Sequence, residues 1–494
     1  MNAATKFFVC LLCRVFLGAG QANAQTADQP TVVSYTLLDG SYLVDECLIC
    51  GRPTIQQPLR GTFDLVLVQD AGSVIKYEVR NIDFTASPAW AGEVHITGNG
   101  TYERFEEFAL LQSMELTTLV KDANGSRPAH FEEDNRSVEV PFPLIKIRLT
   151  QTDGTLLQTY SLELFAAPVR EIWFSTAKPL TSTNRTSPPN EISAGDLLSN
   201  RGRVVKRNSE LVGRLGVMPI VPDLGLDAVQ VTRRSEILFS ITRNVWSETL
   251  GQIQHGDLLS NRGAIVKRNQ ALLAAFFGTT AARPDAGLDA AQVLANGEIL
   301  FSIQSDVVVS SSLKLSRGDL LSDKGHVVKT NRELLANFHP TVTNHDYGLD
   351  ALHILPSGEI WFSVEEAFTD DWLGTVQAGD LLSDRGHHVF SNQQLVAAFA
   401  PSDPSLDYGL DALFVVTDTK PLKPSPRFVA FTRNRASGLN HLEWDGDGDV
   451  FQVEHAPGLS GPWQACSPIV PDLSFDDTCD PALGGSGFYR VRQW

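Results

Sequence analysis

The stretch DYGLDALHILPSGEIWFS, residues 346–363, contains two of four sequence words that recur in fixed order through the middle of the chain. The words are Asp-x-Gly-Leu-Asp-Ala, Glu-Ile-(Trp/Leu)-Phe-Ser, Gly-Asp-Leu-Leu-Ser and a short β-branched segment, which is degenerate in the last copy. Each word occurs four times. The Gly-Asp-Leu-Leu-Ser aspartates lie at 196, 257, 319 and 380, so successive copies are 61, 62 and 61 residues apart. A period this regular indicates an array built from one structural unit.

Each unit is predicted to hold four strands and one short helix. Apolar residues 349–355 and 359–364 flank Pro356-Ser357-Gly358, which has the chemistry of a hairpin turn. Two further short strands follow on either side of residues 384–386. An asparagine then precedes a short helical pattern in every copy, and asparagine is a preferred helix N-cap. The four predicted caps are Asn208, Asn269, Asn331 and Asn392.

The order of the words predicts a closed ring. The first copy begins at its second strand, at Glu171, whereas the missing first strand stands alone after the fourth copy, at residues 409–416. Four complete units result only if the two ends of the array share one sheet. We therefore expect residues 409–416 to pair with residues 171–175. An open stack with an orphan strand at its end is the alternative.

The repeated pattern resembles a hemopexin-type four-bladed β-propeller over residues 171–416. The likeness is carried by an Asp-Ala pair opening the first strand, a glycine-bounded turn and an aromatic pair. The repeats here are longer, and Trp-Phe or Leu-Phe stands where that family usually has Tyr-Phe-Phe. The resemblance implies an architecture and transfers no ligand. The pairs are Asp227-Ala228, Asp289-Ala290, Asp350-Ala351 and Asp411-Ala412.

The segments on either side of the array also read as β structure, so the predicted fold class is mainly β. Residues 25–168 alternate as strands, with turn signals at Gly98-Asn99-Gly100 and at residues 152–154, and predict a β-sandwich or jelly roll. The array occupies residues 169–418, and a proline-rich linker follows at 419–427. Residues 428–494 resemble the fibronectin type III-like modules of bacterial extracellular proteins, with strand patterns such as Leu442-Glu-Trp and Phe451-Gln-Val-Glu.

The first 24 residues read as a signal peptide, which predicts a secreted, extracellular or periplasmic protein. An apolar stretch follows Lys6, and Ala22-Asn23-Ala24 is a typical cleavage site. A cytosolic protein with a hydrophobic first segment is the alternative, since Arg14 interrupts the stretch. No later segment reaches the roughly 18 apolar residues of a membrane span. The formal charge of −18 disfavours nucleic acid as a partner.

Four cysteines remain after the predicted cleavage, in two local pairs. An even count in an exported protein indicates disulfides, so we predict a Cys466–Cys479 bond and regard Cys47–Cys50 as a second possible one. Cys47 and Cys50 also resemble one half of a zinc knuckle, but four-ligand zinc needs another pair nearby. Two free thiols, or a redox dithiol, are the remaining interpretations of this pair.

The Asp-x-Gly-Leu-Asp words are candidate calcium sites. Two carboxylates on either side of a glycine turn can supply the hard oxygen ligands that Ca²⁺ prefers, and no other cofactor is indicated. Turn chemistry is the alternative, in which the first aspartate caps the turn and the second starts a strand. The eight candidates are Asp223, Asp227, Asp285, Asp289, Asp346, Asp350, Asp407 and Asp411.

These observations favour a non-catalytic extracellular binding, adhesion or scaffold protein that displays a repeat-built surface to a protein or glycan ligand. The chain carries none of the common hydrolase, nucleotide-binding or zinc-protease motifs. The acidic words are also equivalent in all four copies, whereas an enzyme usually has one asymmetric site. The competing class is an extracellular hydrolase acting on glycans, with carboxylates gathered at a propeller mouth. A redox protein that uses Cys47 and Cys50 is the third class.

Overall fold

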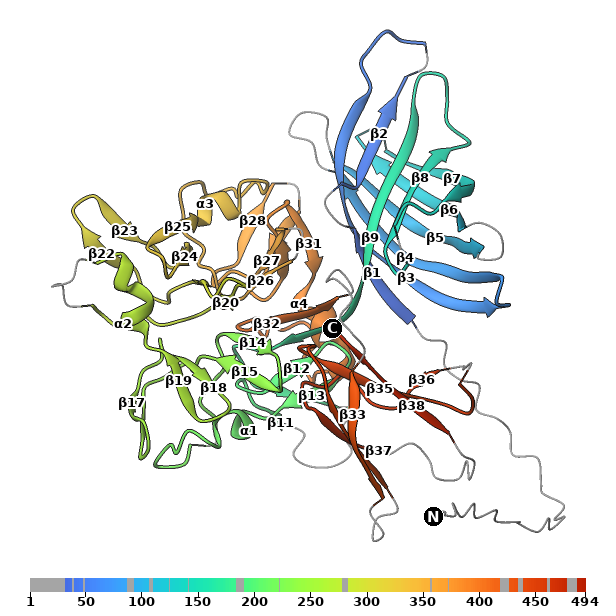
Figure 1. Ribbon diagram of the computed structural model, residues 1–494. Helices are drawn as coiled ribbons and strands as arrows, with labels where there is room; N and C mark the ends of the chain where they lie inside the picture. The colour runs from blue at the N-terminus through green and yellow to red at the C-terminus, as the bar shows by residue number, and fades with distance from the viewer. Residues whose placement is uncertain are drawn as a thin grey trace, which may run out of the picture.

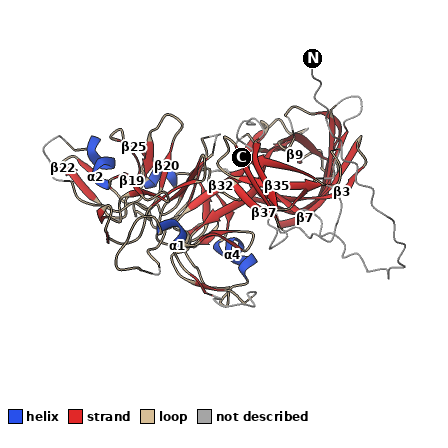
Figure 2. Ribbon diagram, turned by 60° about the horizontal axis from the view of Figure 1, so that its bottom comes forward, coloured by secondary structure: helices blue, strands red, loops and turns tan. Residues whose placement is uncertain are grey.

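The computed structural model is mainly β, with only short helices (Figures 1 and 2). The predicted signal peptide, most of the predicted linker and Cys479 lie outside the described residues. In the described part of the chain, no helix is long and apolar enough to cross a membrane. The structure describes residues 32–37, 40–47, 49–86, 93–105, 110–123, 125–140, 142–183, 191–221, 223–277, 283–355, 358–371, 373–417, 426–433, 439–459, 463–477 and 487–494.

The N-terminal strands pair antiparallel in a ring. Strand β1 pairs with both β3 and β9, so the order β1-β3-β4-β5-β6-β7-β8-β9 returns to its start, and β2 also bridges β3 and β9. Apolar side chains such as Phe63, Phe84 and Phe131 form its core. This hydrogen bonding runs through one sheet, so the sandwich stays a prediction. The strands are β1 (Val32–Leu37), β2 (Tyr42–Glu46), β3 (Ile55–Asp70), β4 (Val74–Ala86), β5 (Val94–Phe105), β6 (Leu111–Asp122), β7 (Gly125–Ser137), β8 (Ile145–Gln151) and β9 (Thr159–Phe174).

The turn expected at Gly98-Asn99-Gly100 is wrong. These residues lie in the middle of β5, where they pair with β6. A Cβ atom on Gly98 would lie 2.3 Å from the Thr117 carbonyl oxygen, and one on Gly100 would lie 2.0 Å from that of Glu115. The glycines are therefore required because the backbones approach closely, which is the other common use of glycine in a strand.

Three four-stranded sheets follow β9, and each has the strand order expected for one unit. Within each sheet the four strands lie side by side in the order in which they occur in the sequence, and each pairs antiparallel with the next. They are β14 (Val229–Thr232), β15 (Glu236–Phe239), β18 (Leu258–Ser260) and β19 (Ala264–Lys267), then β20 (Ala291–Val293), β21 (Ile299–Phe301), β24 (Leu320–Ser322) and β25 (His326–Lys329), then β26 (Leu352–Ile354), β27 (Ile360–Phe362), β30 (Leu381–Ser383) and β31 (His387–Phe390).

A fourth sheet of the same order joins the two ends of the array. Strand β32 (Leu413–Thr417) pairs antiparallel with the end of β9, with Phe414 opposite Trp173, and β9 continues to β12 (Leu197–Ser199) and β13 (Arg203–Lys206). The predicted pairing of residues 409–416 with residues 171–175 is thus confirmed. The first strands of the four sheets also contact one another in a cycle, β14 with β20, β20 with β26, β26 with β32, and β32 with β14.

Residues of the sequence words link neighbouring sheets. The serine that ends Glu-Ile-(Trp/Leu)-Phe-Ser donates its hydroxyl to a leucine carbonyl of the next Asp-x-Gly-Leu-Asp word, as Ser175 does to Leu226 at 2.6 Å. Ser240 and Ser363 make the same bond to Leu288 and Leu410. Because these serines are completely buried, each hydroxyl needs a partner and the bond fixes the spacing of adjacent sheets.

The predicted helices form, but the asparagines are not their N-caps. Each asparagine is instead the first helical residue, and the aspartate of Gly-Asp-Leu-Leu-Ser accepts its backbone N–H, as Asp196 does from Asn208 at 2.8 Å. The caps are the preceding residues Arg207, Arg268, Thr330 and Ser391. The helices are α1 (Asn208–Val212), α2 (Asn269–Leu272), α3 (Asn331–Leu334) and α4 (Asn392–Val396).

Every copy also carries a two-stranded sheet between its second and third strands, which sequence reasoning missed. These segments share no word, so the repeat pattern does not reveal them. Their strands are β10 (Leu180–Thr181) with β11 (Glu191–Ile192), β16 (Val245–Ser247) with β17 (Gly251–Ile253), β22 (Val307–Ser310) with β23 (Leu313–Leu315), and β28 (Phe368–Asp370) with β29 (Gly374–Val376).

The C-terminal residues form two three-stranded sheets that pack on the closing sheet. Trp494 is buried in the same apolar cluster as Trp173 and Phe414. Lys206 of β13 also forms an ion pair of 3.0 Å with Asp472. The sheets are β33 (Arg427–Arg433), β34 (Asn440–Asp445) and β37 (Ser474–Asp477), and β36 (Gln464–Ala465), β35 (Phe451–Ala456) and β38 (Phe488–Gln493).

Candidate functional site

The second aspartates of the four Asp-x-Gly-Leu-Asp words gather where the first strands of the sheets meet. Burial raises the pKa of Asp350 well above its ordinary value, and the negative charges of Asp411, Asp289 and Asp227 raise it further. Burial and the charge of Asp411 likewise raise the pKa of Asp227. Carboxylates that raise one another's pKa in this way lie near one another in a poorly hydrated region. We call these four residues the axial aspartates.

The axial aspartates leave carboxylate oxygens without protein partners. Asp227 is only 5% exposed and Asp289 only 3%, and the Oδ2 atom of each is buried with no hydrogen-bond partner. A buried carboxylate without a partner is costly unless it takes up a proton or a cation. In the part of the chain that the structure describes, no three His, Cys, Asp or Glu side chains are placed to hold a metal directly. The buried oxygens of Asp227 and Asp289 are therefore the atoms that a proton or a cation would satisfy.

The first aspartates of the words have a different role. Asp223, Asp346 and Asp407 each accept the backbone N–H of the glycine two residues later, at 2.9–3.0 Å, and Asp285 does so at 3.4 Å. Asp223 and Asp346 also accept an N–H from the glycine of a Gly-Asp-Leu-Leu-Ser word. This is the turn chemistry given as the alternative. The two aspartates of each word thus have different roles: the first caps the turn, and the second is an axial aspartate.

The four copies differ at one position beside these turns. The second residue after the buried serine of each second strand packs against the glycine of an Asp-x-Gly-Leu-Asp word, and it is Ala177, Thr242, Gln304 or Glu365. Burial raises the pKa of Glu365 to about 7, although Arg317 pairs with it at 2.7 Å. Arg317 also pairs with Glu366 and holds the pKa of that carboxyl below its usual value. The acidic positions of the aspartate words are the same in all four copies, whereas these four residues, which we call the rim residues, differ.

A polar cleft of about 630 Å³ lies between the N-terminal ring and the fourth copy. Strands β3 to β6 supply one wall, and β31 and the start of α4 supply the other. Sequence reasoning missed it because its walls come from segments about 300 residues apart. The charged and hydrogen-bonding side chains that line it are Arg60, Thr62, Asp83, Thr85, Glu93, His95, Lys121, Asp122, His388, Ser391 and Gln394.

Two acidic groups in this cleft have different environments. The ring of His95 lies 2.6 Å from Asp83, and this hydrogen bond raises the pKa of His95. Glu93 is half-buried, and burial raises its pKa despite the nearby His95 and Lys121. The cleft therefore presents a protonatable carboxyl beside an imidazole–carboxylate pair, together with hydroxyl and cationic groups. Such a lining suits a polar ligand with many hydroxyl groups.

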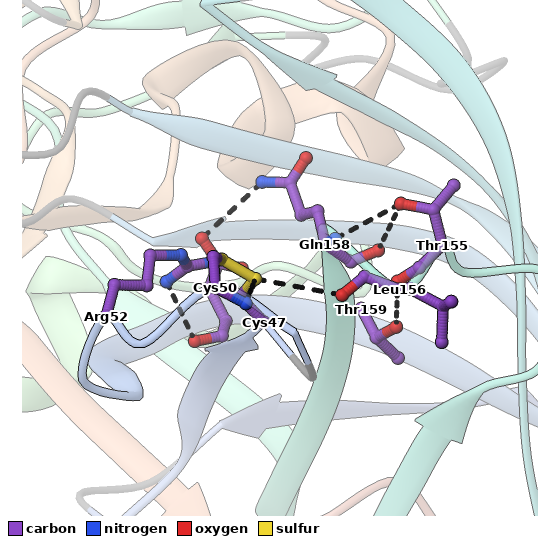
Figure 3. The surroundings of a disulfide bond; sticks show 8 residues. Cys47, Cys50, Arg52, Thr155, Leu156, Gln158 and Thr159 are labelled. Atoms are coloured by element: carbon purple, nitrogen blue, oxygen red, sulfur yellow. Dashed lines mark hydrogen bonds and ion pairs between the residues drawn. A yellow bond between two sulfur atoms is a disulfide. The ribbon is translucent and has the colours of Figure 1, made fainter.

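Cys47 and Cys50 form a disulfide at the end of β2, with their Cα atoms 5.6 Å apart (Figure 3). The Cys47 Sγ atom accepts the backbone N–H of Cys50 at 3.0 Å and lies 3.7 Å from the Leu156 carbonyl oxygen. In this structure the pair is therefore a disulfide, and neither two free thiols nor a zinc knuckle. The predicted Cys466–Cys479 bond stays a prediction, because Cys479 lies outside the described residues.

Neither a protein-family model nor a curated protein sequence matches the chain.

Proposed function

We propose that this is an extracellular binding or adhesion protein whose ligand cleft is non-catalytic. Its four copies form a β-propeller-like body, which a sandwich-like N-terminal domain and a fibronectin type III-like C-terminal domain flank. The ligand is a glycan, and it binds in the cleft between the N-terminal ring and the fourth copy. The polar cleft is the observation that carries this proposal.

The size and chemistry of the cleft support a glycan ligand. Its volume of about 630 Å³ falls in the range of roughly 300–1,000 Å³ typical of ligand sites. Hydroxyl groups from Thr62, Thr85 and Ser391 and charged groups from Asp83 and His95 can hydrogen-bond sugar hydroxyls from two walls. Because the walls belong to separate sheets, a bound ligand would also hold the ring and the fourth copy together.

Calcium on the axis is the second part of the proposal. The first aspartates are engaged by backbone N–H groups, so the cation is assigned to the four axial aspartates, which would hold it through water. Binding there would neutralise part of their mutual repulsion and stabilise the closed arrangement. The four copies would then display their unequal rim residues on a rigid body.

A binding experiment on the full chain tests the ligand assignment. Purified protein is applied to an array of immobilised oligosaccharides, and hits are measured by calorimetry. We expect His95→Ala and Asp83→Asn to weaken binding at least tenfold. His441→Ala is the matched control, because His441 forms an equally short, exposed pair with Asp476 at 2.6 Å in the C-terminal sheets. Equal binding by all three variants, or no binding by the wild type, would contradict the assignment.

The competing class, glycan hydrolysis, has one specific observation in its favour at this cleft. Glu93, whose pKa is raised by burial, could act as an acid, and Asp83, which lies 2.6 Å from the His95 ring, is a second carboxyl in the same cleft; glycosidases use such a pair of carboxyls. Release of reducing ends from a bound oligosaccharide, lost in Glu93→Gln, would establish this class. Intact oligosaccharide recovered after long incubation would instead support the binding protein.

A further inference from the structure

The Cys47–Cys50 disulfide lies outside the packed structure that it adjoins. The last residues of β2 to pair are Glu46 with Thr159 of β9, and Asp45 with Ile55 of β3. The disulfide follows immediately, in the loop before β3, and neither cysteine belongs to the core of the ring. A bond that closes so short a loop constrains the unfolded chain less than a long-range one does. A role in stabilising the ring therefore does not explain this disulfide well.

The two sulfur atoms are not equivalent. The backbone N–H of Cys50 points at the Cys47 Sγ atom at 3.0 Å, and N–H donors favour the thiolate over the thiol. Arg52, two residues after Cys50, is held by Asp45 at 2.6 Å, so its positive charge stays beside the loop (Figure 3). Cys47 is therefore the better leaving group when the disulfide is opened. Both cysteines are half-exposed, so a thiol can reach them.

Exposed apolar side chains lie in the two loops that meet at the disulfide. Ile49, inside the loop, is 64% exposed, and Leu156 and Leu157 of the neighbouring β8–β9 loop are 60% and 63% exposed. The Leu156 carbonyl oxygen is 3.7 Å from Cys47, so this loop is adjacent to the sulfur atoms. Exposed apolar residues next to a reactive group suit an extended polypeptide with apolar side chains better than a small polar thiol.

We propose that Cys47 and Cys50 form a thiol–disulfide exchange site that oxidises dithiols in unfolded, apolar polypeptides. A partner thiolate attacks Cys50 Sγ, a mixed disulfide forms, and the Cys47 thiolate leaves and takes up a proton. The second partner thiol, as its thiolate, then attacks the partner sulfur of the mixed disulfide and expels the Cys50 thiolate, which is protonated. Two electrons pass from the partner dithiol to the protein, which ends with two thiols. A small-molecule disulfide, such as oxidised glutathione, restores the protein disulfide by the reverse exchange.

The first test is a redox titration of the full-length protein. The protein is equilibrated with mixtures of reduced and oxidised glutathione, quenched in acid, alkylated and mapped by peptide mass spectrometry. The Cys47–Cys50 pair should pass from mostly oxidised to mostly reduced within the range of mixtures, while circular dichroism stays unchanged. A pair that stays oxidised in reduced glutathione alone would be a structural bond and would overturn the proposal.

Two sets of variants test its finer points. Thiolate absorbance measures the ionisation of the remaining thiol in each single variant. Cys47 in the Cys50→Ser variant should ionise at lower pH than Cys50 in the Cys47→Ser variant. The reverse order would contradict Cys47 as the leaving group. A reduced peptide with two cysteines flanked by leucines should be oxidised several-fold more slowly by Ile49→Asp than by the wild type. Leu110→Asp is the matched control, because Leu110 is 61% exposed elsewhere on the ring. Equal oxidation rates for both variants would contradict an apolar polypeptide as the substrate.

Discussion

At the scale of single residues, identical neighbours acquire opposite electrostatic environments. Glu365 and Glu366 are adjacent and share Arg317. Burial dominates at Glu365 and raises its pKa to about 7, whereas the hydrogen bond from Arg317 dominates at Glu366 and lowers its pKa. The sequence shows only two consecutive glutamates. Which of them is buried depends on the turn at Gly348, against which the Glu365 side chain packs.

These two glutamates should change the stability of the protein with pH in opposite directions. The folded-state pKa of Glu365 lies above its ordinary value of 4.5, so the folded protein holds its proton more tightly than the unfolded chain. Its contribution to stability is therefore lost as the pH rises from about 4.5 to about 7. Glu365→Gln should raise the melting temperature at pH 8 and leave it nearly unchanged at pH 4.5.

Glu366→Gln is the control of opposite sign. Its folded-state pKa is lowered, so its contribution to stability is present above pH 4.5 and is lost as the pH falls. Because Glu366 is largely exposed, this substitution should lower the melting temperature only slightly at neutral pH. Melting curves at several pH values measure both effects. Equal responses of the two variants would contradict the assigned environments.

At the scale of elements, the short helices hold the turns of the next sequence word. Asn392, the first residue of α4, donates to the Gly409 carbonyl oxygen at 3.0 Å and accepts the Tyr408 backbone N–H at 2.9 Å. Asn208, Asn269 and Asn331 make equivalent bonds in the other copies. In the fourth copy, this turn leads directly into the closing strand β32.

Asn392→Ala should therefore destabilise the protein strongly. The substitution removes the side-chain partner of the Tyr408 N–H and of the Gly379 and Gly409 carbonyl oxygens, at a cost of about 2–4 kcal/mol in the free energy of unfolding. Gln393→Ala is the matched control, because Gln393 is the half-exposed next residue of the same helix. Urea denaturation measures both. A loss below about 1 kcal/mol for Asn392→Ala would show that the turn does not depend on this side chain.

Much of the strand arrangement could be predicted from the sequence, for physical reasons. Apolar words separated by turn residues predicted the four strands of each unit, and the displaced word at residues 409–416 predicted the pairing of β32 with β9. The turn predicted at Gly98 and Gly100 was wrong because glycine is used both in tight turns and where two backbones approach closely. The cleft could not be predicted, because the approach of β3 to β31 of the fourth copy leaves no local sequence pattern. The disulfide could only be given as one of several states of Cys47 and Cys50.

At the scale of the whole molecule, the array is a cycle of four sheets that no single copy could complete. Strand β9 belongs to the N-terminal ring along its first half and to the closing sheet along its second. The axial aspartates occupy the region where the four first strands meet, and each comes from a different copy. Their mutual repulsion is therefore a property of the closed arrangement and would vanish if the sheets separated.

The melting temperature of the full-length protein with and without calcium tests whether the axial aspartates hold a cation. We expect millimolar Ca²⁺ to raise the melting temperature of the wild type at pH 8 and EGTA to lower it. The double variant Asp227→Asn/Asp289→Asn should lose this response while it stays folded. Asp223→Asn, which removes a turn-capping carboxylate, should melt earlier but keep the response. A wild-type melting curve that neither EGTA nor millimolar Ca²⁺ shifts would contradict the calcium assignment and leave the axial aspartates as buried, protonated groups.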